Sequence, residues 1–299
     1  MGNVVLITGA STGFGREASE RFARRGHRVF ATMRESSGRN SAHRRALEQL
    51  AATEKLSLEV LDLDVTDETS VRSAVDQAID RAGRLDVVVN NAGVAALGVT
   101  EAFTPAQFEE VFNINVYGVI RVNRAVLPHM RRQRSGLLIH VSSGAGRCTA
   151  PAMAAYCASK YALEAIADAY RYELRPFGID SILVEPGIYR TPIFDRFLAP
   201  ADRERVADYG PAGEYAERVL GVFRAAISAP DAPGSEEVAD VFVRLAEMPF
   251  GSRPLRTPVS AAMEQLLGGY NATADALRPV VAQIFNVLEL ADAPQTSRG

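Results

Sequence analysis

The segment V4-V-L-I-T-G-A-S-T-G-F-G15 predicts how this chain folds. Its first five residues are apolar or β-branched, which is typical of a strand buried on both faces. Glycines follow at 9, 13 and 15, and an amphipathic helix is expected from residue 14. In doubly wound sheets, a turn between a strand and its following helix holds phosphate groups at the helix N-terminus. A glycine-rich turn alone is a weak signal, but its position at the end of the first strand makes it a strong one.

The composition is that of an ordinary globular protein, with 47% hydrophobic and 23% charged residues among 299. A formal net charge of −3 gives no reason to expect a nucleic-acid-binding surface. The first residues do not resemble a signal peptide, and no window approaches the roughly 18 apolar residues of a membrane span. Two cysteines, Cys148 and Cys157, are too few for a disulfide framework or a metal cluster. We therefore expect a cytoplasmic protein that binds no metal, nucleic acid or membrane.

Strand-like and helix-like segments alternate along the first two thirds of the chain. Such alternation requires parallel strands joined by right-handed crossovers. The sequence therefore predicts an α/β fold in a single domain, with a doubly wound, mainly parallel, Rossmann-like sheet flanked by helices. Strands are expected over 4–8, 28–32, 56–63, 85–90, 136–142 and 179–185, and helices over 14–25, 41–53, 67–82, 105–133 and 152–175.

The pattern loosens after Pro192, where prolines and glycines interrupt two weak helical stretches. A helix over 235–247, a further strand near 253–259 and a helical tail to about residue 290 are expected after them. No linker separates two domains. Residues 1–299 are therefore interpreted as one domain, with a core over 3–191, a mobile substrate-loop insertion over 192–234 and a C-terminal part over 235–299.

The segment Y156-C-A-S-K160 places a lysine one helical turn after a tyrosine, so both side chains point to one face. Only Lys55 and Lys160 are lysines among the 33 basic residues, which indicates that this position requires a compact, titratable ammonium. A free tyrosine has a pKa near ~10, and a neighbouring ammonium lowers it. A pKa closer to the operating pH suits a general acid–base.

Seven motifs of the chain, in order and at matching intervals, resemble the classical branch of the short-chain dehydrogenase/reductase family over roughly residues 3–192. The resemblance implies a Rossmann-like oxidoreductase that reduces a ketone or aldehyde to an alcohol, or catalyses the reverse reaction, with a nicotinamide cofactor. The motifs are T8-G-A-S-T-G-F-G15, D64-V65, N90-N-A-G93, Asn115 in NINVYG, V141-S-S-G-A-G146, Y156-C-A-S-K160 and P186-G-I-Y-R-T191.

The resemblance implies a catalytic set of Asn115, Ser143, Tyr156 and Lys160. In the family, the tyrosine protonates the carbonyl oxygen while the nicotinamide delivers hydride to the carbonyl carbon. Ser143 is expected to hydrogen-bond the substrate oxygen, and Lys160 to hold the nicotinamide ribose. Asn115 is expected to hold a water that connects Lys160 to solvent.

The end of the second strand, F30-A-T-M-R-E35, indicates which cofactor is used. An acidic residue here selects NAD, whereas an arginine suits the 2′-phosphate of NADP. Met33 occupies the acidic position and Arg34 follows it, which favours NADP(H), while Glu35 leaves NAD(H) possible. The predicted cofactor-binding residues are Gly9, Ser11, Thr12, Gly13, Phe14, Gly15, Arg34, Asp64, Val65, Asn91, Ala92, Gly93, Tyr156, Lys160, Pro186, Gly187, Ile188 and Thr191.

The predicted substrate pocket is apolar, which favours a hydrophobic ketone, aldehyde or alcohol. Arg190 is left open as a group that either faces the substrate or faces solvent. Family members usually form dimers or tetramers through two long helices, here 105–133 and 152–175, so a homodimer or homotetramer is expected. The predicted substrate-binding residues are Ser143, Met153, Ile193, Phe194 and Phe197.

Two alternatives remain open: an NAD-dependent secondary-alcohol dehydrogenase, and a non-catalytic NADP(H)-binding sensor. A sensor would be expected to lose part of the Asn–Ser–Tyr–Lys set, and this chain keeps all four residues. An enoyl reductase is disfavoured because such relatives space the tyrosine and lysine more widely. A sugar-nucleotide epimerase is disfavoured by the G-x-x-x-G-x-G turn and by the lack of a second substrate domain.

Overall fold

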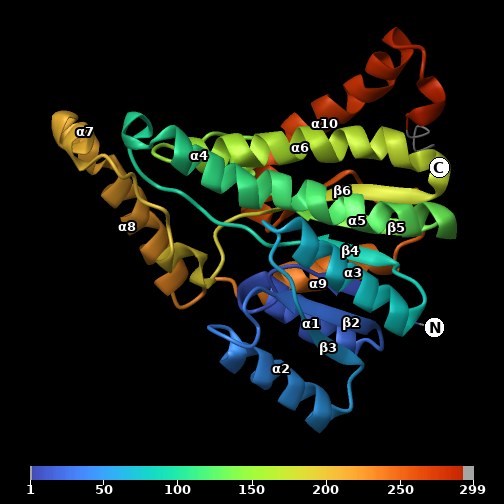
Figure 1. Cartoon of the computed structure of the whole chain (residues 1–299). Helices are drawn as coiled ribbons and strands as arrows, with labels where there is room; N and C mark the ends of the chain where they lie inside the picture. Colours follow the sequence, from blue (N-terminus) through green and yellow to red (C-terminus); the bar gives the residue numbers. More distant parts are fainter. Residues whose placement is uncertain (1, 292–299) are drawn as a thin grey trace.

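The computed structural model describes residues 2–291; Met1 and residues 292–299, part of the predicted C-terminal segment, lie outside the described range. Within that range, seven parallel strands form one sheet in the order β3-β2-β1-β4-β5-β6-β7 (Figure 1). The order changes direction between β1 and β4, where doubly wound sheets bind their ligands at the carboxyl ends of the strands. The strands are β1 Val4–Ile7, β2 Arg28–Met33, β3 Leu58–Asp62, β4 Val87–Asn90, β5 Gly136–Val141, β6 Ile179–Pro186 and β7 Arg256–Val259.

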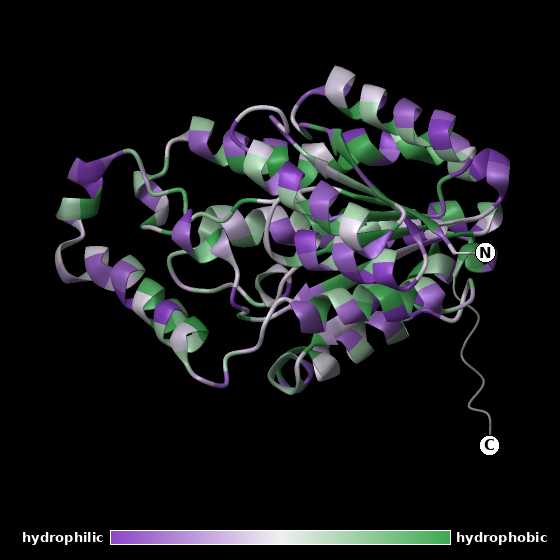
Figure 2. Ribbon diagram, turned by 90° about the horizontal axis from the view of Figure 1, so that it is seen from below, coloured by the Kyte–Doolittle hydropathy of each residue, from purple (hydrophilic) through white to green (hydrophobic). Residues whose placement is uncertain are grey.

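Helices cover both faces of the sheet, which confirms the predicted doubly wound α/β fold. One face packs against α1, α2 and α9 around the fully buried Phe22 and Phe242. The other face packs against α3, α5 and α6 around Val122 and Met130. In Figure 2 the central strands are largely green, and the surrounding helices alternate green with purple, as amphipathic helices must. The helices are α1 Gly13–Arg24, α2 Ser41–Glu54, α3 Glu68–Ala82, α4 Pro105–Phe112, α5 Gly118–Gln133, α6 Ala154–Leu174, α7 Arg203–Asp208, α8 Tyr215–Ser228, α9 Glu236–Glu247 and α10 Ala261–Ile284.

The predicted helix over 105–133 is confirmed, but it contains one irregular turn. A capping box formed by Thr104 and Gln107 begins α4, but a π-helical turn over Asn113–Tyr117 separates α4 from α5. Such turns carry one extra residue and occur frequently at functional sites. The predicted catalytic residue Asn115 lies in this turn. Apolar spacing continues across the interruption, which explains why the pattern alone does not reveal it.

The segment after Pro192 forms the short helix α7 and the longer helix α8, which project from one end of the sheet (Figure 1). Backbone hydrogen bonds join it to the core, because Leu198 O accepts from Leu97 N at 3.0 Å and Leu198 N donates to Ala95 O at 2.9 Å. The expected further strand is confirmed as β7, and α10 then runs beside α6 (Figure 1). Among residues 2–291, no helix has both the length and the apolar character to cross a membrane.

Candidate active site

The glycine-rich turn after β1 packs against the end of β4. Thr8 Oγ1 accepts hydrogen bonds from the backbone N–H groups of Asn91 and Ala92, each at 3.0 Å. The Asn91 amide donates to the carbonyl oxygens of Thr8 and Gly9 at 2.8 and 3.1 Å. Gly9 has a φ of +69°, and a Cβ there would lie 2.9 Å from Ala92 Cα, so the turn requires glycine. Two predicted motifs, 8–15 and 90–93, are thereby joined into one unit.

The beginning of α1 fits a bound pyrophosphate. A Cβ on Gly15 would lie 2.4 Å from Gly9 O and 2.5 Å from Asn91 Nδ2, so a side chain there would push the helix away from the turn. Within the described range, the Thr12 side chain makes no capping hydrogen bond and the first turn of α1 carries no acidic residue. The first N–H groups of the helix are therefore available to an anion.

Other predicted cofactor residues lie at neighbouring strand ends. Thr191 approaches the same turn, 3.4 Å from the position of a Cβ on Gly13. Val65 packs against the start of α5, where a Cβ on Gly118 would lie 2.9 Å from Val65 Cβ. Asp64 Oδ1 accepts from both the backbone N–H and the hydroxyl of Thr66, which shapes the loop after β3. Of the remaining predicted residues, Ser11 lies in the glycine-rich turn, Phe14 begins α1, Pro186 ends β6, and Gly187 and Ile188 follow it.

The end of β2 presents an exposed arginine. Met33 is the last residue of the strand and is buried, whereas Arg34 is exposed. In the part of the chain that the structure describes, Arg34 makes no ion pair, while Glu35 pairs with Arg39 at 3.3 Å. This geometry leaves a guanidinium, and not a carboxylate, free to meet a ligand at this strand end.

Asn115 connects the π-helical turn to the loop after β4. Its Oδ1 accepts from Val94 N, and its Nδ2 donates to Val94 O and to Ser159 Oγ, all at 2.9 Å. Ser159 precedes Lys160 on α6, so the asparagine braces the helix that carries the predicted Tyr–Lys pair. Gly93 is confined here as well, because its Cβ would lie 3.2 Å from Asn115 Oδ1. The amide of Asn115 therefore has a clear positioning role, and its predicted contact with a water stays a prediction.

The structure brings Ser143, Tyr156 and Lys160 together at the end of β5. The Tyr156 hydroxyl lies close enough to Ser143 for the two side chains to interact, and Ser143 Oγ accepts from Ala145 N at 3.1 Å. Lys160 Nζ donates to the carbonyl oxygen of Val141 at 2.8 Å and lies 5.7 Å from the centroid of the Tyr156 ring. The neighbouring Ser142 is buried and lies on the side of Glu164.

Burial controls the proton affinities of the pair. Desolvation raises the pKa of Tyr156 to about 12, against a lowering effect of its hydrogen bond with Ser143. Desolvation also lowers the pKa of Lys160 to about 8, and the Glu164 carboxylate opposes that shift. The expected lowering of the tyrosine pKa is therefore not met in this structure, where burial is the largest effect on Tyr156.

An apolar cluster lies beside Tyr156. Predicted residues Met153, Ile193 and Phe197 belong to it together with Tyr156 and Cys157. The prediction missed the residues of α8 that complete the cluster, although their spacing is that of one helical face. These residues are Ala216, Val219, Leu220 and Phe223.

Phe194 packs against two rings of this apolar cluster, Phe197 and Phe223. Phe194 and Phe197 lie 5.9 Å apart between centroids, and Phe223 lies 5.2 and 5.9 Å from them. Arg190, left open by the sequence, does not join them, because its guanidinium donates to the carbonyl oxygens of Ile227 and Ala229 at the C-terminal end of α8. Arg190 therefore takes no part in the apolar cluster.

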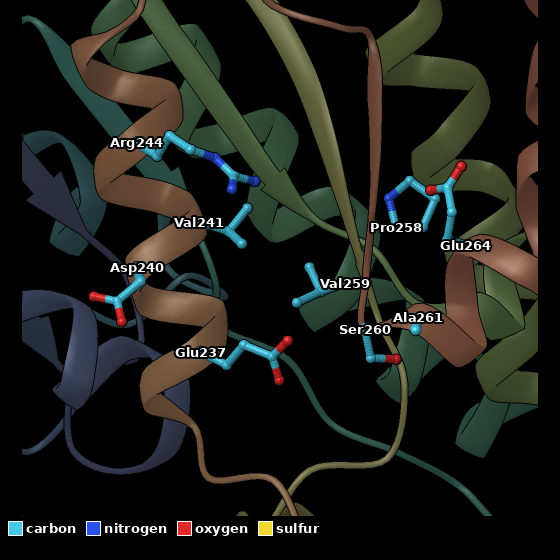
Figure 3. Close-up of a pocket in the computed structure, with 9 residues that line it drawn as sticks. All are labelled: Glu237, Asp240, Val241, Arg244, Pro258, Val259, Ser260, Ala261 and Glu264. Carbon is cyan, nitrogen blue, oxygen red and sulfur yellow. The ribbon is translucent and has the colours of Figure 1, made fainter.

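A separate hollow of about 580 Å³ lies on the surface between α9 and the β7–α10 junction (Figure 3). Its walls carry Glu237, Asp240 and Arg244 from α9 and Glu264 from α10, and the Arg244 side chain extends into it (Figure 3). None of the predicted catalytic or cofactor-binding residues lines this hollow. The candidate active site is therefore the region where the carboxyl ends of the strands meet, and not this hollow.

Comparison with known proteins identifies the family. The model of the short chain dehydrogenase family matches residues 3–201. The chain is 36% identical over 245 residues to the uncharacterized oxidoreductase YusZ of Bacillus subtilis, which covers 81% of this chain and 84% of YusZ. The chain belongs to the short-chain dehydrogenase/reductase family. It is therefore an NAD(P)-dependent oxidoreductase.

Two further comparisons support this family assignment. Human 17-beta-hydroxysteroid dehydrogenase type 1 is 36% identical over 255 residues, which cover 82% of this chain and 74% of that protein. The crystal structure of a short-chain dehydrogenase from Streptomyces avermitilis superposes with a TM-score of 0.75 at 30% identity, over 96% of this chain and 98% of that one. The match extends through the C-terminal helices, beyond the region that the family model covers.

Gly15→Ala is expected to weaken NADPH binding to this short-chain dehydrogenase/reductase by at least about tenfold, because the added methyl group collides with Gly9 O and the Asn91 amide. Gly269→Ala is the matched control, since a Cβ at Gly269 meets nothing within 4 Å. Fluorescence titration with NADPH measures both dissociation constants, and circular dichroism verifies folding. Equal affinities for the two variants would contradict the role of this turn.

Proposed function

We propose that this enzyme reduces a hydrophobic ketone or aldehyde to an alcohol, or catalyses the reverse reaction, with NADP(H) as cofactor. The observation that carries the proposal is the position of Tyr156. Its ring belongs to the apolar cluster of Met153 and Phe197, while its hydroxyl meets Ser143 and its helix presents Lys160 one turn later. The apolar surface that would bind the substrate therefore adjoins the Tyr156 hydroxyl, which can donate a proton.

The side chains support acid–base chemistry on a carbonyl oxygen. Ser143 and Tyr156 form a pair of hydroxyl groups that would hold the oxygen between them, and Tyr156 would donate its proton to the alkoxide as it forms. The Lys160 ammonium stabilises the tyrosinate that remains. A bound nicotinamide would supply the hydride that reduces the carbonyl carbon.

The walls of the cluster support a hydrophobic substrate. Met153, Ile193, Phe197 and the α8 face are apolar, and Arg190 is engaged elsewhere. Burial of apolar area contributes roughly 25 cal/mol per Å², so a bulky apolar substrate gains more from this surface than a small polar one. The likeness to a hydroxysteroid dehydrogenase supports the same substrate class.

The choice of NADP(H) rests on Arg34, which is exposed and unpaired among the described residues at the end of β2. A guanidinium binds a phosphate through two hydrogen bonds, whereas the carboxylate of the next residue, Glu35, pairs with Arg39. The alternative is an NAD-dependent secondary-alcohol dehydrogenase, in which Glu35 would leave Arg39 and bind the adenosine ribose.

The proposal includes a mobile cap and a homo-oligomer. Residues 192–234 carry α7 and α8 over the apolar cluster, and their few contacts with the sheet suit a segment that opens for substrate. A homodimer or homotetramer would form through α4, α5 and α6. Cys148 and Cys157 are free cysteines, which supports a reducing, cytoplasmic location.

A screen of hydrophobic ketones and aldehydes with NADPH and NADH, followed at 340 nm, tests the function directly. Turnover of bulky apolar carbonyls with NADPH is the expected result. Tight NADPH binding without turnover of any member would contradict the proposed reductase.

Tyr156→Phe is expected to lower kcat for a substrate found in this screen by roughly 10²–10⁴-fold, because the proton donor is removed while the ring stays in place. Tyr117→Phe is the control, since that side chain is 50% exposed. Initial rates of NADPH oxidation measure both variants. A Tyr156→Phe enzyme as active as the control would show that the tyrosine is not the acid.

Lys160→Arg should lose most of the activity despite the conserved charge. Lys160 is 5% exposed and fits between Gly93 and Gly146, and an arginine is both larger and unable to release a proton. The rate of ketone reduction is compared with that of Lys55→Arg, which changes the other lysine of the chain, at the end of α2. Near-normal turnover in Lys160→Arg would show that a buried arginine supports catalysis as well as the lysine does.

Arg34→Asp is expected to raise the KM for NADPH by roughly 10- to 100-fold, because it removes a charge-assisted hydrogen bond that contributes about 1.5–3 kcal/mol. The KM for NADH should fall or stay unchanged. Arg45→Asp, an equal change of charge at an exposed position of α2, is the control. An unchanged preference for NADPH in Arg34→Asp would exclude this residue as the phosphate ligand.

A further inference from the structure

A second buried polar cluster lies behind the catalytic helix, centred on Arg256 of β7. Arg256 is 6% exposed, and its Nε lies 2.8 Å from Glu164 Oε2 while its Nη2 lies 3.0 Å from Asp168 Oδ2. Both carboxylates belong to α6, the helix of Tyr156 and Lys160. Buried ion pairs are weak sources of stability because desolvation offsets their attraction. Stability alone therefore does not account for this cluster.

Residues from three other elements complete the cluster. Glu185 of β6 is fully buried, and its Oε2 accepts from Asn271 Nδ2 of α10 at 2.7 Å. Asn271 Oδ1 in turn accepts from Arg147 Nε at 3.0 Å. Glu185 Oε1 lies 3.9 Å from Arg147 Nε and 4.0 Å from Arg256 Nε. The loop after β5, β6, β7 and α10 thus all contribute to one charged group beneath α6.

This cluster reaches the catalytic residues through Glu164. Lys160 and Glu164 are one turn apart on α6 and lie against consecutive residues at the end of β5. Lys160 Nζ donates to Val141 O, and the Glu164 carboxylate interacts with the Ser142 hydroxyl, although neither Ser142 Oγ nor Glu164 Oε1 completes a close hydrogen bond within the described range. The next residue of the strand end is Ser143.

A glycine marks the point where these groups meet. A Cβ on Gly146 would lie 2.7 Å from Ser142 Oγ, 3.2 Å from Glu164 Cγ and 3.3 Å from Lys160 Cβ. The two side chains of α6 and the serine therefore enclose one small volume that only glycine leaves free. Any shift of Glu164 acts directly on Lys160 and on the end of β5.

We propose that Glu164, held in place by Arg256, is a positioning residue that keeps the Lys160 ammonium charged and the end of β5 in register with Tyr156. The inference rests on the proposed function, since it takes Tyr156 and Lys160 to perform the acid–base chemistry. It also makes the C-terminal segment from Arg256 to Asn271 a support of the active site.

The charges around Lys160 set the direction of the expected effect. Tyr156 and Glu164 lie one turn from Lys160 on α6, and Glu164 is paired with Arg256 of β7. Arg147 of the loop after β5 and Glu185 of β6 adjoin that pair. Burial lowers the pKa of Lys160 to about 8, and Glu164, whose own pKa burial raises and Arg256 lowers, is the charge that opposes this shift. Because the pKa of Tyr156 is about 12, Lys160 is the first of the pair to lose its proton as the pH rises.

Glu164→Gln removes the opposing negative charge and keeps the volume of the side chain. The pKa of Lys160 should fall, so the alkaline limb of kcat for ketone reduction should move to lower pH by about one unit. The KM for the ketone should change little, since Glu164 is not part of the apolar cluster. Rates of NADPH oxidation between pH 6 and 10, roughly the range in which Lys160 titrates, measure both quantities.

Asp180→Asn is the matched control. Asp180 of β6 is buried and pairs with Arg171 of α6 and with Arg253, so its loss also removes a buried carboxylate that faces this helix. Asp180 contacts none of the catalytic residues. This variant should lose stability in thermal melting and keep the pH profile of the unmodified enzyme.

Glu164→Asp keeps the negative charge and changes the position of the carboxylate, so it distinguishes the two effects. It also replaces Glu164→Gln as the test if that variant does not fold. The shorter carboxylate keeps its charge but withdraws from Ser142, so a smaller shift in the same direction is expected. A folded Glu164→Gln or Glu164→Asp enzyme with an unshifted alkaline limb would overturn the inference. If that result came with an inactive Tyr156→Phe enzyme, the proposed function would stand and only the role of Glu164 would fall.

Discussion

A buried ammonium is the constraint on which the centre of this molecule depends. Lys160 is 5% exposed, and its Nζ donates a hydrogen bond to the carbonyl oxygen of Val141. Burial of a charge is costly unless polar groups replace its hydration. Gly146 leaves space beside the lysine, because a Cβ there would lie 3.3 Å from Lys160 Cβ. Gly146 belongs to a motif of the family, and the lysine gives one physical reason for it.

Most of the fold and most of the site could be predicted from local sequence, because the signals involved are local. Buried parallel strands are apolar throughout, helices end at glycines, and the phosphate turn lies between one strand and one helix. The π-helical turn at Asn115 could not be predicted, since one extra residue leaves the apolar spacing nearly unchanged. The partner of Glu164 is also invisible in the sequence, because Arg256 lies 92 residues away and only the packing of β7 brings it near.

The two parts of the chain differ in what they contribute. Residues 3–201, which the family model covers, contain the phosphate turn, Ser143, Tyr156 and Lys160. The apolar face of α8, Arg256 of β7 and α10 lie beyond that region. The shared part thus holds the groups that suit a nicotinamide cofactor and a carbonyl oxygen. The later part adds the surface that suits one substrate over another, together with a brace against the back of the catalytic helix.

The π-helical turn over Asn113–Tyr117 has a consequence for protein engineering. Removing one of its residues would allow an uninterrupted helix from α4 into α5, with regular hydrogen bonds, and such a change is attractive to any selection for heat resistance. It would also rotate one helix against the other by about 100°, so the amide of Asn115 would no longer face Val94 and Ser159. The irregularity is therefore a place where thermal robustness and activity are in conflict, and libraries screened for melting temperature alone would be expected to discard it.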